Sequence, residues 1–384
     1  MGHAILLAGM AHLGPEPHST RNPTPMRLLA LPIISTLSLL GCGQSSGGAE
    51  EINANLSHTY EPQMLDVGEE SSDVCQSWAL GNEQPIYVKK VRQTNEGGWH
   101  HSNWFFVPET AYPPNHEVEG PNATLDGTWD CVDRDFHEYI AAAAGGVFFA
   151  QSTQALQELQ AFPDGAALEI PAHSVIVGST HLLNISAAPL ETSITMDVET
   201  VPADEVEIRL TPFSFAIGAL EIPPQVDGVP KESRSSMMCD LTEPFQKTLG
   251  ADEVDYNVYY VLGHYHKWGK SFNLSFVHDD GRRETIFEIE NRIGEPIGSI
   301  IDPPMNNNGA TRLRSECGFL NNTDKTLHRG LQDGEMCDFL AYTDSNLKMG
   351  SGGGENHPMG EDENGVALYE IDCGPVTAIK AYND

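Results

Sequence analysis

Positive charge is scarce in this 384-residue chain, which has 21 lysine and arginine residues against 55 aspartate and glutamate residues. The net charge of −34 repels nucleic acids and anionic lipid headgroups, so neither is expected as a charge-driven partner. Such a surface favours cations or cationic substrates, or it simply keeps the protein soluble outside the cell.

Helical periodicity is also scarce, with candidates only at residues 135–143 and 152–160. The chain instead breaks into short runs rich in β-branched and aromatic residues, separated by glycine, proline, asparagine and aspartate. The clearest runs are residues 86–91, 103–107, 174–180, 193–199, 206–210, 256–262 and 271–277. Many short strands without alternating helices predict an all-β fold of sandwiches or barrels.

Long apolar runs are absent except for Leu28–Leu40, which is too short to span a bilayer as a helix. Met26-Arg27 precedes this run and Gly41-Cys42 follows it, as in a secretory signal. The ending resembles a bacterial lipobox, in which Cys42 is lipidated, although an ordinary signal peptide cut elsewhere is the alternative. We therefore expect a signal segment over residues 1–41 that starts at Met26, a tether over 42–70, and a protein lipid-anchored to the bacterial cell envelope outside the cytoplasm. The lipid is its only expected membrane contact.

Cysteine is used sparingly, and no CxxC pair is present, which makes a thiolate zinc or redox site unexpected. Without Cys42 there are six cysteines, namely Cys75, Cys131, Cys239, Cys317, Cys337 and Cys373. An even number in an exported chain predicts three disulfides, but six cysteines allow about 15 pairings, so the sequence leaves the connectivity open.

A histidine pair closes the alternating run 256–262. In a strand, residues i and i+2 point to the same face, so His264 and His266 can offer two imidazoles to one metal ion. Taken alone, this pattern is also common in histidines that bind nothing.

A methionine in an unusual setting lies about seventy residues further on, in the segment Glu335-Met336-Cys337-Asp338. A thioether is a soft ligand that suits Cu(I), and two imidazoles with one thioether form a copper site rather than a zinc or magnesium site. The alternative for Met336 is a filler of the hydrophobic core.

A second pair of histidines, His100 and His101, follows Gly97-Gly98. Neighbouring residues in a regular strand face opposite sides, so both can bind one metal ion only at a bulge or a strand end, which the glycines permit. The best third ligand is His181, at the end of the run 174–180, with His173 as its rival. Three imidazoles form a copper or zinc site.

Together these elements resemble the copper type II, ascorbate-dependent monooxygenases, the family of the peptidylglycine α-hydroxylating and dopamine β-monooxygenases. The resemblance covers roughly residues 75–375 and is carried by the order of the histidines, the H-x-H pair and the E-M-C segment. Two further segments agree, Ile222-Pro223-Pro224 before Cys239 and the stretch 266–270, HKWGK.

The resemblance implies two coppers per chain. His100, His101 and His181 would hold an electron-storing copper, and His264, His266 and Met336 a catalytic copper. The implied reaction hydroxylates an unactivated C–H bond with O₂ and a one-electron donor such as ascorbate, on a small molecule or peptide that the sequence does not identify.

The resemblance also implies two tandem antiparallel β-sandwiches of jelly-roll type, shared with peptide-N-glycosidase. Residues 71–188 would form the electron-transfer domain and residues 189–384 the catalytic domain. The implied disulfides are Cys75–Cys131, Cys239–Cys373 and Cys317–Cys337.

Four positions depart from the family pattern. Leu262 stands where the peptide-processing members have an arginine that binds the substrate carboxylate, and Asp338 and Leu340 replace an asparagine and a tyrosine. A peptide carboxylate is therefore not expected as a ligand, and Asp338 either favours a cationic substrate or is a solvated acid. Ser179 replaces a glutamine near the first site, which leaves the route of the electron open.

Two other functions compete with the hydroxylase: a surface protein that captures copper without oxidising anything, and a metal-free glycan-processing or adhesion protein on the same paired sandwich. The retention of all six ligands favours the enzyme. The acidic stretch 355–364 is expected to be a solvated loop, with calcium binding as the alternative.

Overall fold

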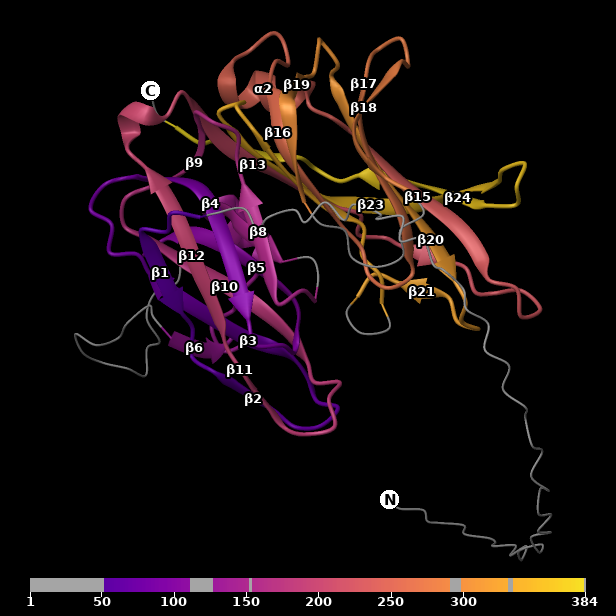
Figure 1. Ribbon diagram of the computed structural model, residues 1–384. Coiled ribbons are helices and arrows are strands. Elements are labelled where there is room, and N and C mark those ends of the chain that lie inside the picture. The colour runs from indigo at the N-terminus through magenta and orange to yellow at the C-terminus, as the bar shows by residue number, and fades with distance from the viewer. Residues whose placement is uncertain (1–51, 111–126, 152–153, 291–297, 331–333, 383–384) are drawn as a thin grey trace, which may run out of the picture. The chain divides into compact units, whose positions relative to one another are not determined.

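The computed structural model describes residues 52–110, 127–151, 154–290, 298–330 and 334–382 (Figure 1). The expected signal segment, the lipidation site at Cys42 and the start of the expected tether lie outside the described residues. Among the residues described, no helix is long and apolar enough to cross a membrane.

Strands dominate the described chain, and each of the seven β-type runs overlaps a strand. Up to residue 201 the strands are β1 (Leu56–Thr59), β2 (Gln63–Leu65), β3 (Glu70–Ala79), β4 (Ile86–Asn95), β5 (Trp99–Pro108), β6 (Gly127–Asp130), β7 (Gly146–Gln151), β8 (Gln157–Ala161), β9 (Ala166–Ile170), β10 (Ser174–Leu183), β11 (Leu190–Thr192) and β12 (Ile194–Val201). The later strands are β13 (Ile208–Ala216), β14 (Glu221–Ile222), β15 (Lys231–Asp240), β16 (Asn257–His264), β17 (Gly269–Val277), β18 (Arg283–Ile289), β19 (Ser299–Asn306), β20 (Arg312–Asn321), β21 (Leu327–His328), β22 (Asp338–Thr343), β23 (Leu347–Glu361), β24 (Ala367–Cys373) and β25 (Thr377–Lys380). The helices of the described part are α1 (Glu138–Ala144), α2 (Thr242–Leu249) and the short 3₁₀ helix η1 (Ala203–Glu205).

One of the two expected helices is confirmed and the other is wrong. Helix α1 overlaps the first expected helix over residues 138–143, whereas residues 157–160 of the second lie in strand β8. Strand β8 pairs with β4, and its residues Glu158 and Gln160 are buried there. Pairing with a neighbouring strand thus overrides a weak local helix preference.

The acidic stretch is not a loop over most of its length. Residues 355–361 belong to β23, which pairs antiparallel with β24 in the hairpin drawn in yellow in Figure 1. Backbone pairing does not depend on side-chain polarity, so an exposed acidic segment can form a strand when a partner strand is fixed beside it. The turn follows at residues 362–365, where the Asp362 carboxylate accepts the backbone N–H groups of Asn364 and Val366.

The first hydrophobic core lies between two layers of strands. One layer is the five-stranded sheet β6-β3-β10-β5-β7, and the other contains β1, β12, β4, β8 and β9. Trp104 and Ile176 from the first layer pack with Val91 and Met196 from the second. The alternation of apolar and polar residues along these strands produces this sandwich, because successive side chains point to opposite faces.

The limits of this first core differ from the expected domain limits. Strands β1 and β2 lie in the segment expected to be a tether, and they pair with β12 and β11. The core also extends beyond residue 188 to Leu210 on β13, and it includes Leu262 on β16 and Leu340 and Tyr342 on β22.

The second core begins at Phe213. It lies between strands β13, β22, β16 and β19 on one side and β24, β15, β20, β17 and β18 on the other. Strand β13 belongs to both halves, since its first residues pair with β9 and its later residues with β22 and β23. The two cores are therefore joined by a continuous hydrogen-bonded strand rather than by a linker.

The three implied disulfides are all present, as Cys75–Cys131, Cys239–Cys373 and Cys317–Cys337. Disulfides form and persist in oxidising compartments, so the structure indicates an extracytoplasmic protein. Cys317–Cys337 also fixes the segment that contains Met336 to strand β20.

Candidate metal centre and adjoining cavity

The adjacent histidines of the first pair occupy a β-bulge, as their spacing predicts. His101 lies opposite His181 on β10, and the next paired residue of β5 is Trp99, so His100 is the extra residue of the bulge. Gly97 and Gly98 precede it with positive φ angles of 101° and 75°, which glycine adopts without strain. The bulge turns both imidazoles toward the same region, where their ring centroids lie 5.5 Å apart.

The third histidine of this half is His181, which is 3% exposed. Its Nε2 atom lies 2.5 Å from a carboxylate oxygen of Glu70 on β3. The rival His173 immediately precedes β10 and is exposed, at the opposite end of that strand from His181, roughly 26 Å away at the rise of an extended chain. The structure therefore brings His181, and not His173, to the pair.

The second pair lies at the end of β16. His264 is the last residue of that strand and His266 lies two residues beyond it, with their ring centroids 5.1 Å apart. The buried carboxylate of Glu335 accepts the backbone N–H groups of His266 and Trp268, both at 2.8 Å. His266 Nδ1 also lies 3.1 Å from the carbonyl oxygen of Gly334, so the Glu335 segment fixes this ring.

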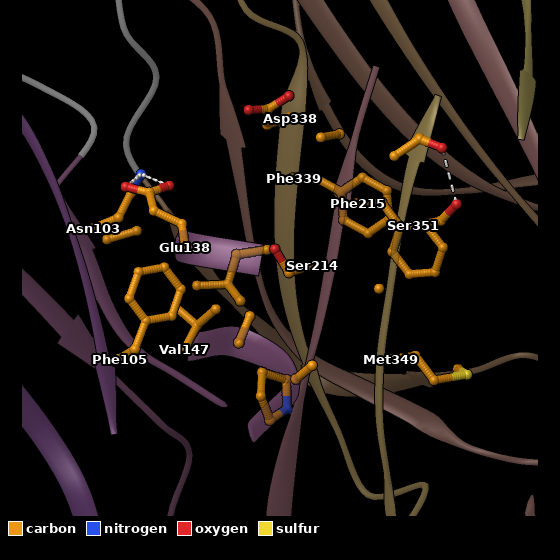
Figure 2. Close-up of a pocket in the computed structure, with 18 of the residues that line it drawn as sticks. Asn103, Phe105, Glu138, Val147, Ser214, Phe215, Asp338, Phe339, Met349 and Ser351 are labelled. Atoms are coloured by element: carbon orange, nitrogen blue, oxygen red, sulfur yellow. Dashed lines mark hydrogen bonds between the residues drawn. The ribbon is translucent and has the colours of Figure 1, made fainter. Parts of the chain in front are cut away.

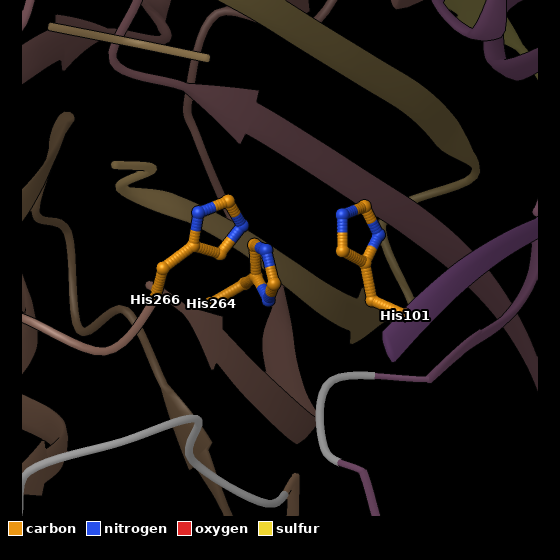
Figure 3. A group of neighbouring side chains, drawn as sticks. All are labelled: His101, His264 and His266. Atoms are coloured by element: carbon orange, nitrogen blue, oxygen red, sulfur yellow. The ribbon is translucent and has the colours of Figure 1, made fainter. Parts of the chain in front are cut away.

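All five histidines meet in one group, which we call the histidine cluster: His100, His101, His181, His264 and His266. Ring centroids across the two pairs lie 5.4 Å apart for His101 and His264 and 5.6 Å apart for His101 and His266. The possible ligand atoms of His101, His264 and His266 all lie within 4.8 Å of one another (Figure 3). The two ligand sets that the sequence suggests are thus next to each other, and one three-histidine group draws on both.

Met336 follows Glu335 directly, and its backbone N–H donates to the Glu335 carboxylate at 3.3 Å. The side chain is half-buried rather than part of the second core. The same carboxylate accepts the backbone N–H of His266, so the Glu335 side chain links the backbones of Met336 and His266.

Three nitrogen atoms of the cluster are buried without a hydrogen-bond partner among the described residues, namely His101 Nε2, His181 Nδ1 and His266 Nε2. Buried polar atoms are nearly always satisfied, so three such atoms in one cluster indicate missing partners. Imidazole nitrogens bind copper and zinc. These residues fit a metal ion.

The protonation of the cluster supports the same interpretation. Burial lowers the pKa of His100 to about 4, with further lowering from His181 and His266. Burial and the neighbouring histidines also hold the pKa values of His101 and His264 well below 6.5. Neutral imidazoles are the form that binds metal ions.

A cavity of about 700 Å³ adjoins the cluster and has His264 in its wall. In Figure 2 Asn103, Phe105, Glu138 and Val147 lie on one side of the strands that carry Ser214 and Phe339. Pockets of this size that are lined mostly by apolar side chains commonly hold small-molecule ligands.

The residues that depart from the family pattern surround this cavity. Leu262 and Leu340 line it, as does Asp338. Arg329 binds Asp338 through two parallel hydrogen bonds of 2.6 and 2.7 Å. The charge of Asp338 is therefore balanced within the protein, which weighs against a cationic substrate at this residue.

Ser179, the fourth departure, donates a hydrogen bond to the Glu138 carboxylate, which also accepts from Asn103 Nδ2. Burial raises the pKa of Glu138.

Four side chains of the site have roles that the sequence does not reveal: Glu70, Glu138, Arg329 and Glu335. Glu335 lies in a recognisable segment, yet nothing there shows that its carboxylate binds the backbone after His264. The partners of the other three lie between 9 and 111 residues away in the chain, so no local pattern identifies them.

A second group of possible ligands, Glu355, His357 and Asp372, lies on the hairpin of β23 and β24. All three are exposed, and His357 Nε2 already lies 3.0 Å from Asp372.

Comparison with known proteins leaves the family open. No family model matches the chain, and no curated protein matches it. Among solved structures, the PBSX exported protein XepA is similar over 75% of this chain and 86% of its own, with 8% identity and a TM-score of 0.19. The VP2 subviral particle of infectious bursal disease virus is similar over 77% of this chain and 73% of its own, with 9% identity and a TM-score of 0.17. Similarities this distant do not bear on function.

Proposed function

We propose that this protein is a copper-dependent monooxygenase that hydroxylates a C–H bond with O₂ and a one-electron donor such as ascorbate. The observation that carries the proposal is the histidine cluster, in which three buried ring nitrogens without partners lie together beside a cavity. In the overall reaction R–H, O₂, two electrons and two protons give R–OH and water. Copper, when bound, supplies the one-electron redox chemistry and the reduction of O₂.

The histidines have separate supports that fix their orientation. Glu70 binds His181 Nε2 and leaves Nδ1 for the metal ion, as carboxylates behind histidine ligands commonly do. Glu335 holds the backbone of His266, and the carbonyl of Gly334 fixes its Nδ1, which leaves Nε2 for the metal ion. These supports keep the ligands in place before the metal ion arrives.

The proposal includes two coppers per chain, one with His100, His101 and His181 and one with His264, His266 and Met336. It also includes the finer fold assignment, two jelly-roll-like sandwiches arranged as in the ascorbate-dependent monooxygenases. Two features support the assignment of the copper ligands: the disulfide that fixes the Met336 segment, and the bulge at His100.

The cavity would hold the substrate. His264 belongs to both the cluster and the cavity wall, so a molecule in the cavity reaches the metal centre from that side. The apolar lining from Phe105, Val147 and Leu262 excludes water from the reacting C–H bond.

The test is the copper content per chain after anaerobic loading with Cu(I) and desalting. We expect two coppers in the wild type, and one in each of His181→Ala and Met336→Ala, because each variant removes a ligand of a different site. The matched control is His173→Ala, which changes an exposed histidine at the far end of β10 and keeps both coppers.

A copper-capture protein without oxidase activity is the second candidate, favoured by the closeness of the two ligand sets. In that case the group of His101, His264 and His266 holds one copper, and neither His181→Ala nor Met336→Ala removes it. A wild type that binds no copper overturns both candidates and leaves a metal-free protein.

A further inference from the structure

The cavity beside the histidine cluster has a floor made by neighbouring strands of one sheet. Strands β25, β23, β13, β22 and β16 lie side by side there, and their pairing fixes which residues share a row. Because alternate residues face the same side, the cavity face carries three rows. The rows are Ile379, Lys348, Pro212 and Tyr342; Thr377, Gly350, Ser214, Leu340 and Leu262; and Gly352, Ala216, Asp338 and His264.

The middle of this floor is flat because its residues are small. Gly350, Gly352, Ser214 and Ala216 occupy neighbouring positions on β23 and β13. A Cβ atom placed on Gly352 would meet no atom within 4 Å, which shows that open space lies above it. Short side chains at these positions leave room for an extended chain that lies across the strands.

Lys348 occupies one corner of this floor and lines the cavity. It is half-buried, and none of the residues described forms an ion pair or hydrogen bond with its ammonium group. Burial lowers its pKa, and no neighbouring charge contributes. In a protein with 55 acidic residues, an unpaired lysine in a cavity wall points to an anionic ligand.

The other charged groups of the cavity are already satisfied. Asp338 is paired with Arg329, and Glu138 accepts hydrogen bonds from Asn103 and Ser179. An incoming anion therefore gains most at Lys348, where it displaces no existing partner.

His264 lies at the diagonally opposite corner. From Lys348, His264 lies three strands away across the sheet and four residues away along the strand direction. At ordinary strand spacings this is a separation of roughly 20 Å. A ligand that touches both corners is long, with one anionic end.

We propose that the substrate is an anionic amphiphile, such as a long-chain carboxylate, whose head binds Lys348 and whose apolar chain crosses the small-residue floor to His264. This inference rests on the proposed function for its chemical step. At that step a C–H bond near the distal end of the chain is replaced by C–OH, with O₂ as the oxidant, two electrons and two protons from a donor such as ascorbate and solvent, and water as the second product.

Binding is tested first on the metal-free protein, by calorimetric titration with hexadecanoate and with the neutral hexadecan-1-ol. We expect Lys348→Met to weaken hexadecanoate binding at least about ten-fold, the scale of a charge-assisted hydrogen bond, and to leave hexadecan-1-ol binding unchanged. Lys380→Met is the matched control, because this exposed lysine on the neighbouring strand β25 does not line the cavity.

A second variant tests the floor. Gly352→Leu places a side chain in the open space and should weaken both ligands, with the circular dichroism spectrum unchanged. Equal binding of hexadecanoate by the wild type and Lys348→Met overturns the inference. So does tighter binding of hexadecylamine than of hexadecanoate, which would assign the site to a cation.

The two proposals fail separately, because binding needs no copper. If hexadecanoate binding depends on Lys348 but the chain loads no copper, the oxygenase proposal is overturned and the proposed ligand class stands. Copper loading without hexadecanoate binding overturns the ligand and keeps the metal centre. If both hold, mass spectrometry of the product should place the hydroxyl near the distal end, and a hydroxyl next to the carboxylate overturns the orientation.

Discussion

Two groups among the described residues each bring three possible metal ligands within 4.8 Å of one another, but the groups differ in burial and in hydrogen bonding. The group of His101, His264 and His266 is largely enclosed, carries neutral imidazoles and has buried nitrogens without partners. The exposed group of Glu355, His357 and Asp372 has a histidine already bonded to a carboxylate. Close spacing alone is weak support for a metal site. Buried ligand atoms without hydrogen-bond partners support it better, because a metal ion would then displace no existing partner.

The largest expected difference between the two groups is in their response to copper. Saturating Cu(I) should stabilise the wild type by about 3–4 kcal/mol for each copper bound, at 100 to 1,000 times the dissociation constant, because the ion binds only the folded state. His101→Ala should lose about half of this stabilisation, because it removes a ligand of one of the two proposed copper sites, and His357→Ala should keep all of it. The measurement is the midpoint of thermal unfolding with and without Cu(I), and equal losses in both variants would refute the distinction.

Glu335→Gln should weaken the cluster without removing a ligand. The carboxylate accepts two backbone N–H groups after His264, and an amide can accept with only one of its two ends. We expect a loss of about 1–3 kcal/mol in the free energy of unfolding by urea. Glu355→Gln, in the exposed group, should change this free energy by less than about 0.5 kcal/mol.

The two groups should also respond to pH with opposite signs. The pKa of His100 is about 4 in the folded state and near 6.5 when unfolded, so below pH 6.5 the unfolded state binds more protons. The stability of the metal-free protein should therefore fall as the pH drops from 6.5 toward 4. For His100 alone the loss is about 1–2 kcal/mol, after discounting the screening of a half-buried ring. His100→Gln should flatten this slope in urea titrations across the range.

His357 behaves in the opposite way. Its hydrogen bond to Asp372 raises its pKa above 6.5, so its stabilising effect is present below pH 6.5 and is lost as the pH rises through the raised value. Because the pair is exposed, His357→Gln should change the acid-side slope little. A variant that flattens the slope as much as His100→Gln does would contradict the comparison.

The smallest expected effect concerns Glu70. Glu70→Gln keeps the size of the side chain but replaces the carboxylate bonded to His181 Nε2. We expect about a ten-fold loss in copper affinity, the lower end for a residue that orients a metal ligand, measured by competition with a chromophoric Cu(I) chelator. Asp372→Asn in the exposed group should leave the affinity unchanged.

Much of the fold could be predicted from local patterns. Alternating apolar residues identify the strands around residues 86–91 and 256–262 because a strand buries every second side chain. The expected helix at residues 152–160 is wrong because residues 157–160 form strand β8, whose partner β4 lies some sixty residues earlier in the chain. The expected loop at residues 355–361 is a strand for the same reason. It pairs with β24, and its own acidic composition does not indicate that pairing.

The candidate site divides in the same way. The residue types and their spacing single out His100 with His101 and His264 with His266, and the glycines predict the bulge at His100. Their meeting in one cluster depends on β13, which joins the two cores, and on the long-range carboxylates Glu70 and Glu335.

The sequence by itself determined the β-rich character, the even set of cysteines and which histidines are candidate ligands, because these follow from side-chain chemistry and short-range periodicity. Only the tertiary structure decided that the two ligand sets adjoin, that Asp338 is neutralised by Arg329, and that Lys348 lies unpaired across a flat floor from His264. Those facts depend on strand register, which determines which residues are neighbours across the sheet. The register is fixed by the packing of the whole chain rather than by any one segment.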